Sequence, residues 1–223
     1  MHTRVHKRAL PFLVLLTMLA GAGADERRPA NVMSYHGASW LERADREGEQ
    51  KPAEVIRVMG LKDGDVVADV GCGTGFFARR MAQAVAPRGR VYAVDIQKEM
   101  LDLLNEYVEK EGIKNVVPLL GDADDPKLPP GRLDWIILVD VYHEFQQPKP
   151  MLAKMRDALK PQGRIALIEY RGEGDSAAHI KADHRMTVEQ VLAEWLPAGF
   201  RLEARHEFLP TQHFFVFARA DPR

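Results

Sequence analysis

The sequence lacks residues that several classes of protein need. Its 223 residues include a single cysteine, Cys72, which excludes an intramolecular disulfide framework and a zinc site built from several cysteines. The formal net charge is -1, so the basic surface of a general nucleic-acid binder is missing. Internal repeats and low-complexity runs are also absent. With 46% hydrophobic residues, the chain is expected to form one globular domain with a sizeable core and to bind no nucleic acid.

The first 24 residues have the three parts of an export signal. Arg4, Lys7 and Arg8 form a positive segment, residues 9–20 are apolar, and residues 22–24 read Ala-Gly-Ala, a small-residue cleavage pattern. The apolar run is too short to span a bilayer comfortably. We expect residues 1–24 to be a signal peptide, the protein to be exported to the periplasm, and the mature chain to have no membrane span. An uncleaved leader that tethers the protein to the membrane is the alternative.

The rest of the chain alternates between strand-like and helix-like patterns. Residues 25–52 form a polar lead-in that could act as a flap, and residues 53–223 form the main domain. Apolar runs at residues 66–71, 90–96, 116–123, 133–139 and 164–171 predict five buried strands, separated by helices. Residues 200–209 and 212–220 predict a terminal hairpin. This order predicts an α/β fold with a doubly wound, mostly parallel seven-stranded Rossmann-like sheet that ends in an antiparallel hairpin.

The turn after the first predicted strand carries three glycines spaced two apart, Gly71, Gly73 and Gly75. A dinucleotide-binding turn has the spacing G-x-G-x-x-G, but Phe76 occupies the position of its last glycine. The Gly-Lys-Ser/Thr of a phosphate-binding loop is absent as well. Asp69 precedes the first glycine, and its negative charge favours a cationic ligand with an amino group over an anion.

Two further carboxylates follow the next two strands, where a doubly wound sheet binds its ligands. Asp95 ends the second strand and can accept hydrogen bonds from both hydroxyls of an adenosine ribose, as found in S-adenosylmethionine and in NAD. Asp122 follows the third strand and can accept a hydrogen bond from the exocyclic amine of adenine. Together with the glycine loop, they predict a cofactor that contains adenosine.

With these motifs the chain resembles a class I S-adenosylmethionine-dependent methyltransferase, similar to the small-molecule enzymes of ubiquinone and menaquinone biosynthesis. The resemblance is carried by VVADVGCGTGFFA at residues 66–78, VYAVDIQKEML at 91–101, GDADDPKLP at 121–129, LDWIILVDVYHEF at 133–145 and ALKPQGRIALIEY at 158–170. It implies an enzyme that uses S-adenosylmethionine and methylates an oxygen, carbon or nitrogen atom of a small molecule. The cofactor-binding residues that it implies are Asp69, Gly71, Gly73, Gly75, Asp95, Ile96, Asp122, Ala123 and Asp140.

The sequence says less about the residues that would contact the methyl acceptor. Tyr142, His143 and Glu144 leave the fourth strand toward the expected pocket and are the candidate catalytic residues. His143 could be a general base, because imidazole titrates near neutrality, and a structural histidine is the equal alternative. His179 and His184 follow the fifth strand, but their five-residue spacing does not share a helix face, so we expect no metal site.

Two other readings of the sequence remain open. A non-catalytic module could keep the pocket, although the three aspartates after the first three strands argue that the cofactor is still bound. An NAD-dependent oxidoreductase is disfavoured by Phe76 and by the terminal hairpin. We expect a monomer or a homodimer.

Overall fold

The structure, a computed structural model, describes residues 28–220, and the predicted signal peptide lies outside these residues. The strands are β1 (Val66–Val70), β2 (Arg90–Asp95), β3 (Val116–Leu120), β4 (Leu133–Val139), β5 (Leu159–Tyr170), β6 (Phe200–His206) and β7 (Gln212–Arg219). The α-helices are α1 (Arg46–Gln50), α2 (Pro52–Met59), α3 (Phe76–Val85), α4 (Lys98–Lys110), α5 (Pro148–Ala158) and α6 (Val188–Trp195). Three short 3-10 helices complete the described part: η1 (Tyr35–Glu42), η2 (Tyr142–Glu144) and η3 (Ala182–His184).

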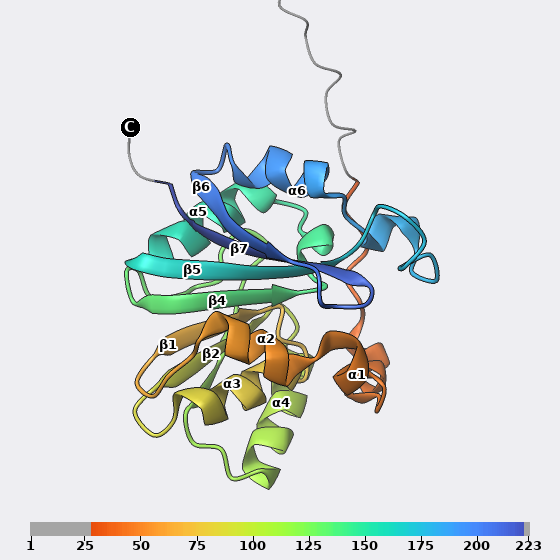
Figure 1. The fold of residues 1–223 in the computed structure, drawn as a ribbon. Helices are drawn as coiled ribbons and strands as arrows, with labels where there is room; N and C mark the ends of the chain where they lie inside the picture. The colour runs from red at the N-terminus through yellow and green to blue at the C-terminus, as the bar shows by residue number, and fades with distance from the viewer. Residues whose placement is uncertain (1–27, 221–223) are drawn as a thin grey trace, which may run out of the picture.

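The strands form one sheet in the order β3-β2-β1-β4-β5-β7-β6 (Figure 1). Strands β1 to β5 pair in parallel, whereas β7 runs antiparallel to both β5 and β6. This confirms the predicted doubly wound sheet with its terminal hairpin. The strand order reverses between β1 and β4, and ligands of such sheets bind beside this point, outside the carboxyl ends of the strands.

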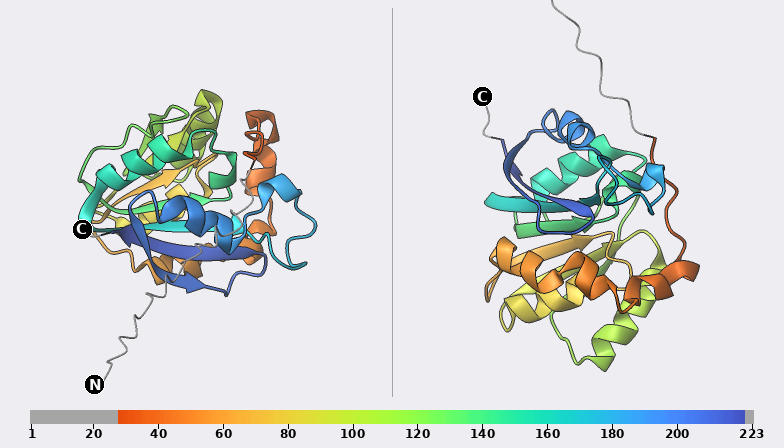
Figure 2. Two further views of the ribbon diagram at one scale, coloured as in Figure 1. Left: turned by 90° about the horizontal axis from the view of Figure 1, so that it is seen from above. Right: turned by 45° about the vertical axis from the view of Figure 1, so that its right-hand side comes forward.

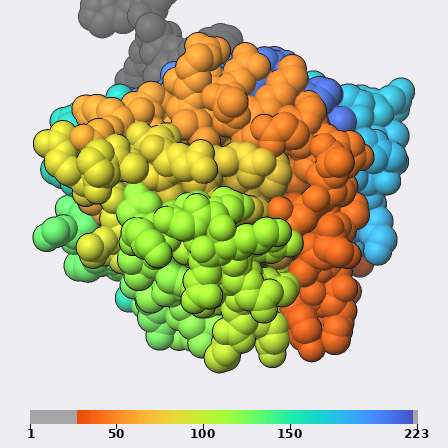
Figure 3. Space-filling model, turned by 90° about the horizontal axis from the view of Figure 1, so that it is seen from below, coloured from red at the N-terminus to blue at the C-terminus, as the bar shows by residue number. Residues whose placement is uncertain are grey.

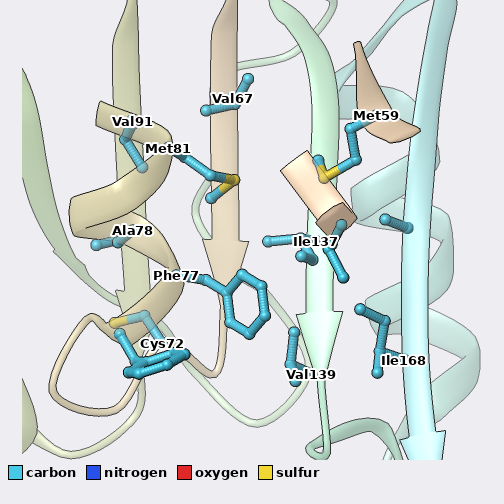
Figure 4. Packing of buried hydrophobic residues seen from close by; sticks show 14 of the residues in the cluster. Met59, Val67, Cys72, Phe77, Ala78, Met81, Val91, Ile137, Val139 and Ile168 are labelled. Atoms are coloured by element: carbon cyan, nitrogen blue, oxygen red, sulfur yellow. The ribbon is translucent and has the colours of Figure 1, made fainter. Parts of the chain in front are cut away.

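Helices cover both faces of the sheet, and each face has its own apolar core. Neighbouring residues of β1 belong to different cores, because successive side chains of a strand point to opposite faces: Val67 packs with α2, α3 and α4, and Ala68 packs with α5 and α6. Figure 4 shows the first core, where Phe77 and Met81 of α3 lie over the strands that carry Val67 and Ile137. Burial on both faces explains why β1 and β4 in the middle of the sheet are almost continuously apolar.

The boundary between α5 and β5 differs from the sequence-based expectation. The apolar pattern predicted a strand that starts at residue 164, but α5 ends at Ala158 and β5 begins at Leu159. Pro161 cannot continue a helix, and Leu159 is fully buried opposite Leu133 of β4. Tertiary packing therefore extends the strand backward into residues that look like a helix end.

Residues 28–50, which we call the N-terminal segment, run along the edge of the molecule at the carboxyl ends of the strands (Figure 2). Figure 3 shows this segment, in red to orange, as a strip beside α3 and α4. Hydrogen bonds attach it to the sheet edge: Ala30 N donates to the carbonyl of His143 at 3.0 Å, and Tyr35 N donates to Gln97 Oε1 at 3.0 Å. The segment thus forms a wall next to the predicted ligand position.

Candidate active site

A cavity of about 410 Å³ lies at the carboxyl ends of the parallel strands, within the size range of small-molecule sites. Its walls come from the residues after β1, β2, β3 and β4, from the N-terminal segment, and from the connection after β5. The predicted residues that line it are Gly71, Gly73, Asp95, Ile96, Asp122, Ala123, Asp140, His143 and Glu144. The predicted residues Asp69, Gly75 and Tyr142 do not line it.

Asp95 links the glycine loop to the end of β2. Its Oδ2 accepts a hydrogen bond from Gly73 N, and its Oδ1 accepts one from Gln97 N, both at 2.9 Å. Burial raises the pKa of this carboxyl group, and the two backbone N–H groups oppose the rise. Each carboxylate oxygen has a further lone pair, so Asp95 retains the capacity to accept from the two hydroxyls of a ribose.

The three glycines of the loop have different roles. All have positive φ values, which favour glycine. Gly71 and Gly73 line the cavity, as expected if the backbone approaches a ligand. Gly75 is instead the N-cap of α3, and a Cβ atom at this position would lie 2.1 Å from Leu104 Cδ1 of α4. A Cβ atom at Gly71 or Gly73 would also crowd a side chain, so all three glycines are needed for packing and only the first two also line the cavity.

Asp69 lies in β1, just before the glycine loop, and is buried. Its Oδ2 accepts a hydrogen bond from Ala78 N in the first turn of α3 at 2.9 Å. Burial raises the pKa of Asp69 to about 7, although the Ala78 N–H and the charge of Arg46 oppose the rise. The geometry assigns Asp69 to the attachment of α3. A contact between its carboxylate and a cofactor stays a prediction.

Asp140 follows β4, and its two carboxylate oxygens differ in their hydrogen bonding. Its Oδ2 accepts from the side-chain amides of Gln50 and Gln212, each at 2.7 Å, while Oδ1 is buried without a partner among residues 28–220. Burial raises the pKa of Asp140 to about 7, and the charge of Glu169 adds to this effect. A buried carboxylate oxygen of this kind is suited to a cationic or hydrogen-bond-donating ligand group.

Arg46 is a site residue that the sequence reasoning missed. The side chain lines the cavity, is 7% exposed, and donates hydrogen bonds to Gln50 Oε1 and to the Leu41 carbonyl, both at 2.7 Å. Its guanidinium carbon lies 4.2 Å from the centre of the Phe76 ring, a cation–π contact. A buried guanidinium in this place can bind a ligand carboxylate. The short polar sequence of α1, REGEQ, carries no local signal that would identify it.

The residues expected around an adenine lie at the mouth of the cavity. Ile96 is 45% exposed there, although it is apolar, so a ligand ring could cover it. Asp122 is also at the mouth, and its carboxylate forms an ion pair with Lys127 at 2.6 Å. An adenine amine would compete with that lysine for the carboxylate.

The three candidate catalytic residues form the turn η2, and their side chains point in different directions. Tyr142 is fully buried in the core, where it packs against Phe145 and Trp195 and donates a hydrogen bond to Glu194 at 2.6 Å. Tyr142 therefore does not face the cavity, contrary to the sequence-based expectation. Successive residues of a helical turn point in different directions, so His143 and Glu144 can reach the cavity when Tyr142 does not.

The side chain of Glu169, in β5, holds the turn η2 in place. One of its oxygens accepts from Tyr142 N at 2.7 Å, and the other contacts His143 Nδ1 at 2.7 Å. Burial lowers the pKa of His143, but the charges of Glu169, Asp140 and Glu144 raise it more, to about 9. Burial raises the pKa of Glu144 to about 7. The acceptor side of the cavity thus has the buried Glu169 next to the half-buried Glu144.

Comparison with known proteins identifies this arrangement. A family model described as a methyltransferase domain matches residues 61–208. The chain belongs to this methyltransferase family. The matched region contains the glycine loop, Asp95, Asp122, Asp140 and η2, so the sequence elements that predicted the cofactor are those of the family. The comparisons confirm the predicted family and its cofactor, S-adenosylmethionine.

Individual relatives of this methyltransferase point the same way. The demethylmenaquinone methyltransferases of Geobacillus kaustophilus and Geobacillus stearothermophilus are 29% and 28% identical to it over 116 residues, which is 52% of this chain. The chain spans about half the length of these curated relatives. A crystal structure of a SAM-dependent methyltransferase from Aquifex aeolicus has 27% identity and a TM-score of 0.78, and the match covers 83% of this chain and 98% of that one.

The fold is also found outside methyl transfer. The [4+2]-cyclase SpnF shares it with a TM-score of 0.67 at 16% identity, over 90% of this chain and 88% of that one. This likeness shows the fold alone, and function has to be argued from the site.

Proposed function

We propose that this protein transfers the methyl group of S-adenosylmethionine to an oxygen, carbon or nitrogen atom of a small molecule. The observation that carries the proposal is Asp140 Oδ1, a buried carboxylate oxygen without a partner among the described residues, at the wall of a cavity that also holds Arg46 and Asp95. Asp140 suits the cationic end of the cofactor, Arg46 suits its carboxylate, and Asp95 suits its ribose.

When bound, the cofactor supplies a methyl group on a positively charged sulfur, which leaves as a neutral thioether. The protein's task is to align the acceptor with this carbon and to exclude water. Glu169 holds η2 through Tyr142 N and His143 Nδ1, so His143 is fixed in orientation where an acceptor would enter. An acceptor oxygen or nitrogen would lose its proton to solvent or to a side chain of this turn.

The walls of the cavity favour an apolar acceptor. They include Met33 and Trp40 from the N-terminal segment, Val141 and Phe145 near η2, and Ile180 from the connection after β5. Apolar side chains recognise an acceptor through the surface that they remove from water. A quinol with an apolar tail fits this lining, and the first compound to test is demethylmenaquinol, the reduced form of the demethylmenaquinone in the curated relatives' names.

We also propose that the protein is exported and that residues 1–24 are removed. The support is the positive, apolar and small-residue order of the leader. Within residues 28–220, no helix is long and apolar enough to cross a membrane. Sequencing the N terminus of the native protein tests this proposal: a start at Asp25 supports cleavage, and a start at Met1 contradicts it.

The function is tested in two steps with the purified protein. Titration calorimetry with S-adenosylhomocysteine and, separately, with NAD measures which cofactor binds, and failure to bind S-adenosylhomocysteine would refute the proposal. Transfer of an isotope-labelled methyl group to demethylmenaquinol and to a panel of small catechols, phenols and amines then measures turnover. Binding without transfer to any member of the panel would favour the non-catalytic module.

A further inference from the structure

The acceptor side of the cavity contains a cluster of possible metal ligands that comes from two distant parts of the chain. His143 and Glu144 belong to η2, and His184 ends η3 in the connection after β5. One ligand atom from each residue lies within 4.8 Å of the other two. The rings of His143 and His184 have their centres 5.1 Å apart, and all three residues line the cavity.

Both histidines of this cluster are oriented by a carboxylate. His143 Nδ1 contacts Glu169 Oε2 at 2.7 Å, and His184 Nδ1 contacts Asp183 Oδ1 at 2.8 Å. Histidines that bind metals generally place one ring nitrogen on a carboxylate or carbonyl, which fixes the ring and leaves the other nitrogen for the ion. With Nδ1 of both rings on carboxylates, Nε2 is the atom of each ring that we assign to an ion.

Glu144 supplies the third ligand and is held in place from the N-terminal segment. Its Oε1 accepts a hydrogen bond from Met33 N at 3.2 Å, and a second carboxylate oxygen remains to bind an ion. Glu169 and Asp183 also place negative charge beside the two histidines, which favours a cation there. Two histidines and one glutamate are a known ligand set for catalytic zinc, with the fourth position open.

We propose that His143, Glu144 and His184 bind a zinc-class divalent ion at the acceptor side of the cavity. Donors around tetrahedral zinc lie about 3.3 Å apart, from metal–ligand distances of about 2.0 to 2.1 Å. The ligand atoms of the three residues lie within 4.8 Å of one another, so the cluster must close to this spacing as it binds an ion. The proposal departs from the sequence-based expectation of no metal, which considered only His179 and His184, because the fold brings η2 beside η3.

The ion's role rests on the proposed function. An acceptor hydroxyl bound at the open position would lose its proton to solvent and attack the methyl carbon. The new bond to carbon forms as the carbon–sulfur bond of the cofactor breaks, leaving neutral S-adenosylhomocysteine. Metal coordination increases the fraction of deprotonated acceptor near neutral pH.

The test measures metal binding directly, on full-length protein without an affinity tag. After metal is removed with a chelator, Zn²⁺ affinity is measured in competition with a chromophoric chelator, and Co²⁺ is added to record the visible bands of a four-coordinate site. We expect one ion per chain. Glu144→Gln and His184→Gln should each weaken Zn²⁺ binding by at least about 100-fold, and Asp183→Asn by about tenfold, since orienting carboxylates affect affinity less than ligands do.

His179→Gln is the matched control, because His179 lines the same cavity from the same connection but lies outside the cluster. It should bind Zn²⁺ with unchanged affinity. Absence of Zn²⁺ binding to the wild-type protein, or equal affinity in the wild type and His184→Gln, would overturn the proposal. S-adenosylhomocysteine binding is measured in parallel on every variant. Failure of the wild-type protein to bind S-adenosylhomocysteine, with Zn²⁺ binding retained, would refute the proposed function and leave the metal site standing.

Discussion

Asp140→Asn is expected to stabilise the protein and weaken its cofactor binding at the same time. The substitution keeps the shape of the side chain, and asparagine tolerates the φ of 51° at this position. Its carbonyl oxygen can still accept from Gln50 and Gln212, which now bind Oδ2. What disappears is the negative charge of a half-buried side chain whose Oδ1 atom is itself buried.

The expected gain in the free energy of unfolding follows from the pKa of Asp140, which burial raises from 3.8 to about 7. The folded protein holds this proton more tightly than the unfolded chain, so ionisation costs stability as pH rises from about 4 to 7, and the full cost applies at pH 8. Three pKa units correspond to about 4 kcal/mol. The new amide N–H has no partner and costs about 1 to 3 kcal/mol, which leaves a net gain of roughly 1 to 3 kcal/mol.

Thermal unfolding without ligand at pH 8 measures the gain, which should appear as a Tm higher by roughly 2 to 12 °C for a domain of this size. The difference should shrink at pH 5, where the carboxyl group of the folded wild-type protein is already neutral. Calorimetric titration with S-adenosylmethionine measures the loss. A charged hydrogen bond is worth about 1.5 to 3 kcal/mol, so the Kd should rise by about 10- to 150-fold.

Asp102→Asn is the control, since Asp102 is an exposed residue of α4 paired with Lys98 at 2.6 Å. Surface pairs of this kind contribute about 0 to 1 kcal/mol, and the site is not involved. A lower Tm of Asp140→Asn at pH 8, or an unchanged Kd for S-adenosylmethionine, would refute the reasoning that Asp140 is a buried charge kept for a cationic ligand.

Three further predictions use other parts of the site. Gly75→Ala should lower the free energy of unfolding by at least about 2 kcal/mol more than Gly112→Ala, measured in urea, because both glycines have positive φ but only Gly75 would also clash with a leucine of α4; equal losses would contradict the packing role. Arg46→Met should raise the Kd for S-adenosylmethionine about 10- to 100-fold. Arg80→Met should leave this Kd unchanged, although Arg80, like Arg46, contacts the ring of Phe76. Burial also raises the pKa of Asp69 to about 7, so the free energy of unfolding of the ligand-free protein should fall from pH 6 to pH 8, and an increase over that range would argue against it.

The sheet could be predicted because each of its buried strands is recognisable from residues that are neighbours in the sequence. Each buried strand is an apolar run, and its end is marked by a carboxylate or a glycine, so Asp95 could be placed beside the glycine loop without coordinates. The first residue of β5 could not be placed in the same way, because Leu159 joins the strand only through its position opposite Leu133.

The parts of the site that depend on distant contacts were not predictable. Arg46 looks like an ordinary charged residue in REGEQ, and only the approach of Phe76 and the cavity make it a buried cation. Tyr142 and His143 are neighbours in sequence, yet the turn sends one into the core and the other to the cavity. His184 reaches η2 only because the connection after β5 returns over the sheet edge.

Gln97 has a consequence for how quickly a ligand can leave. Its side chain holds the N-terminal segment at two points, since Nε2 donates to the Met33 carbonyl at 2.9 Å and Oε1 accepts from Tyr35 N at 3.0 Å. Its backbone N–H donates to Asp95, the residue assigned to the ribose. The same residue therefore joins the ligand-binding carboxylate to the wall above it. We expect the residence time of the cofactor to depend on how often this wall detaches, and its affinity and its release rate to be set by different residues.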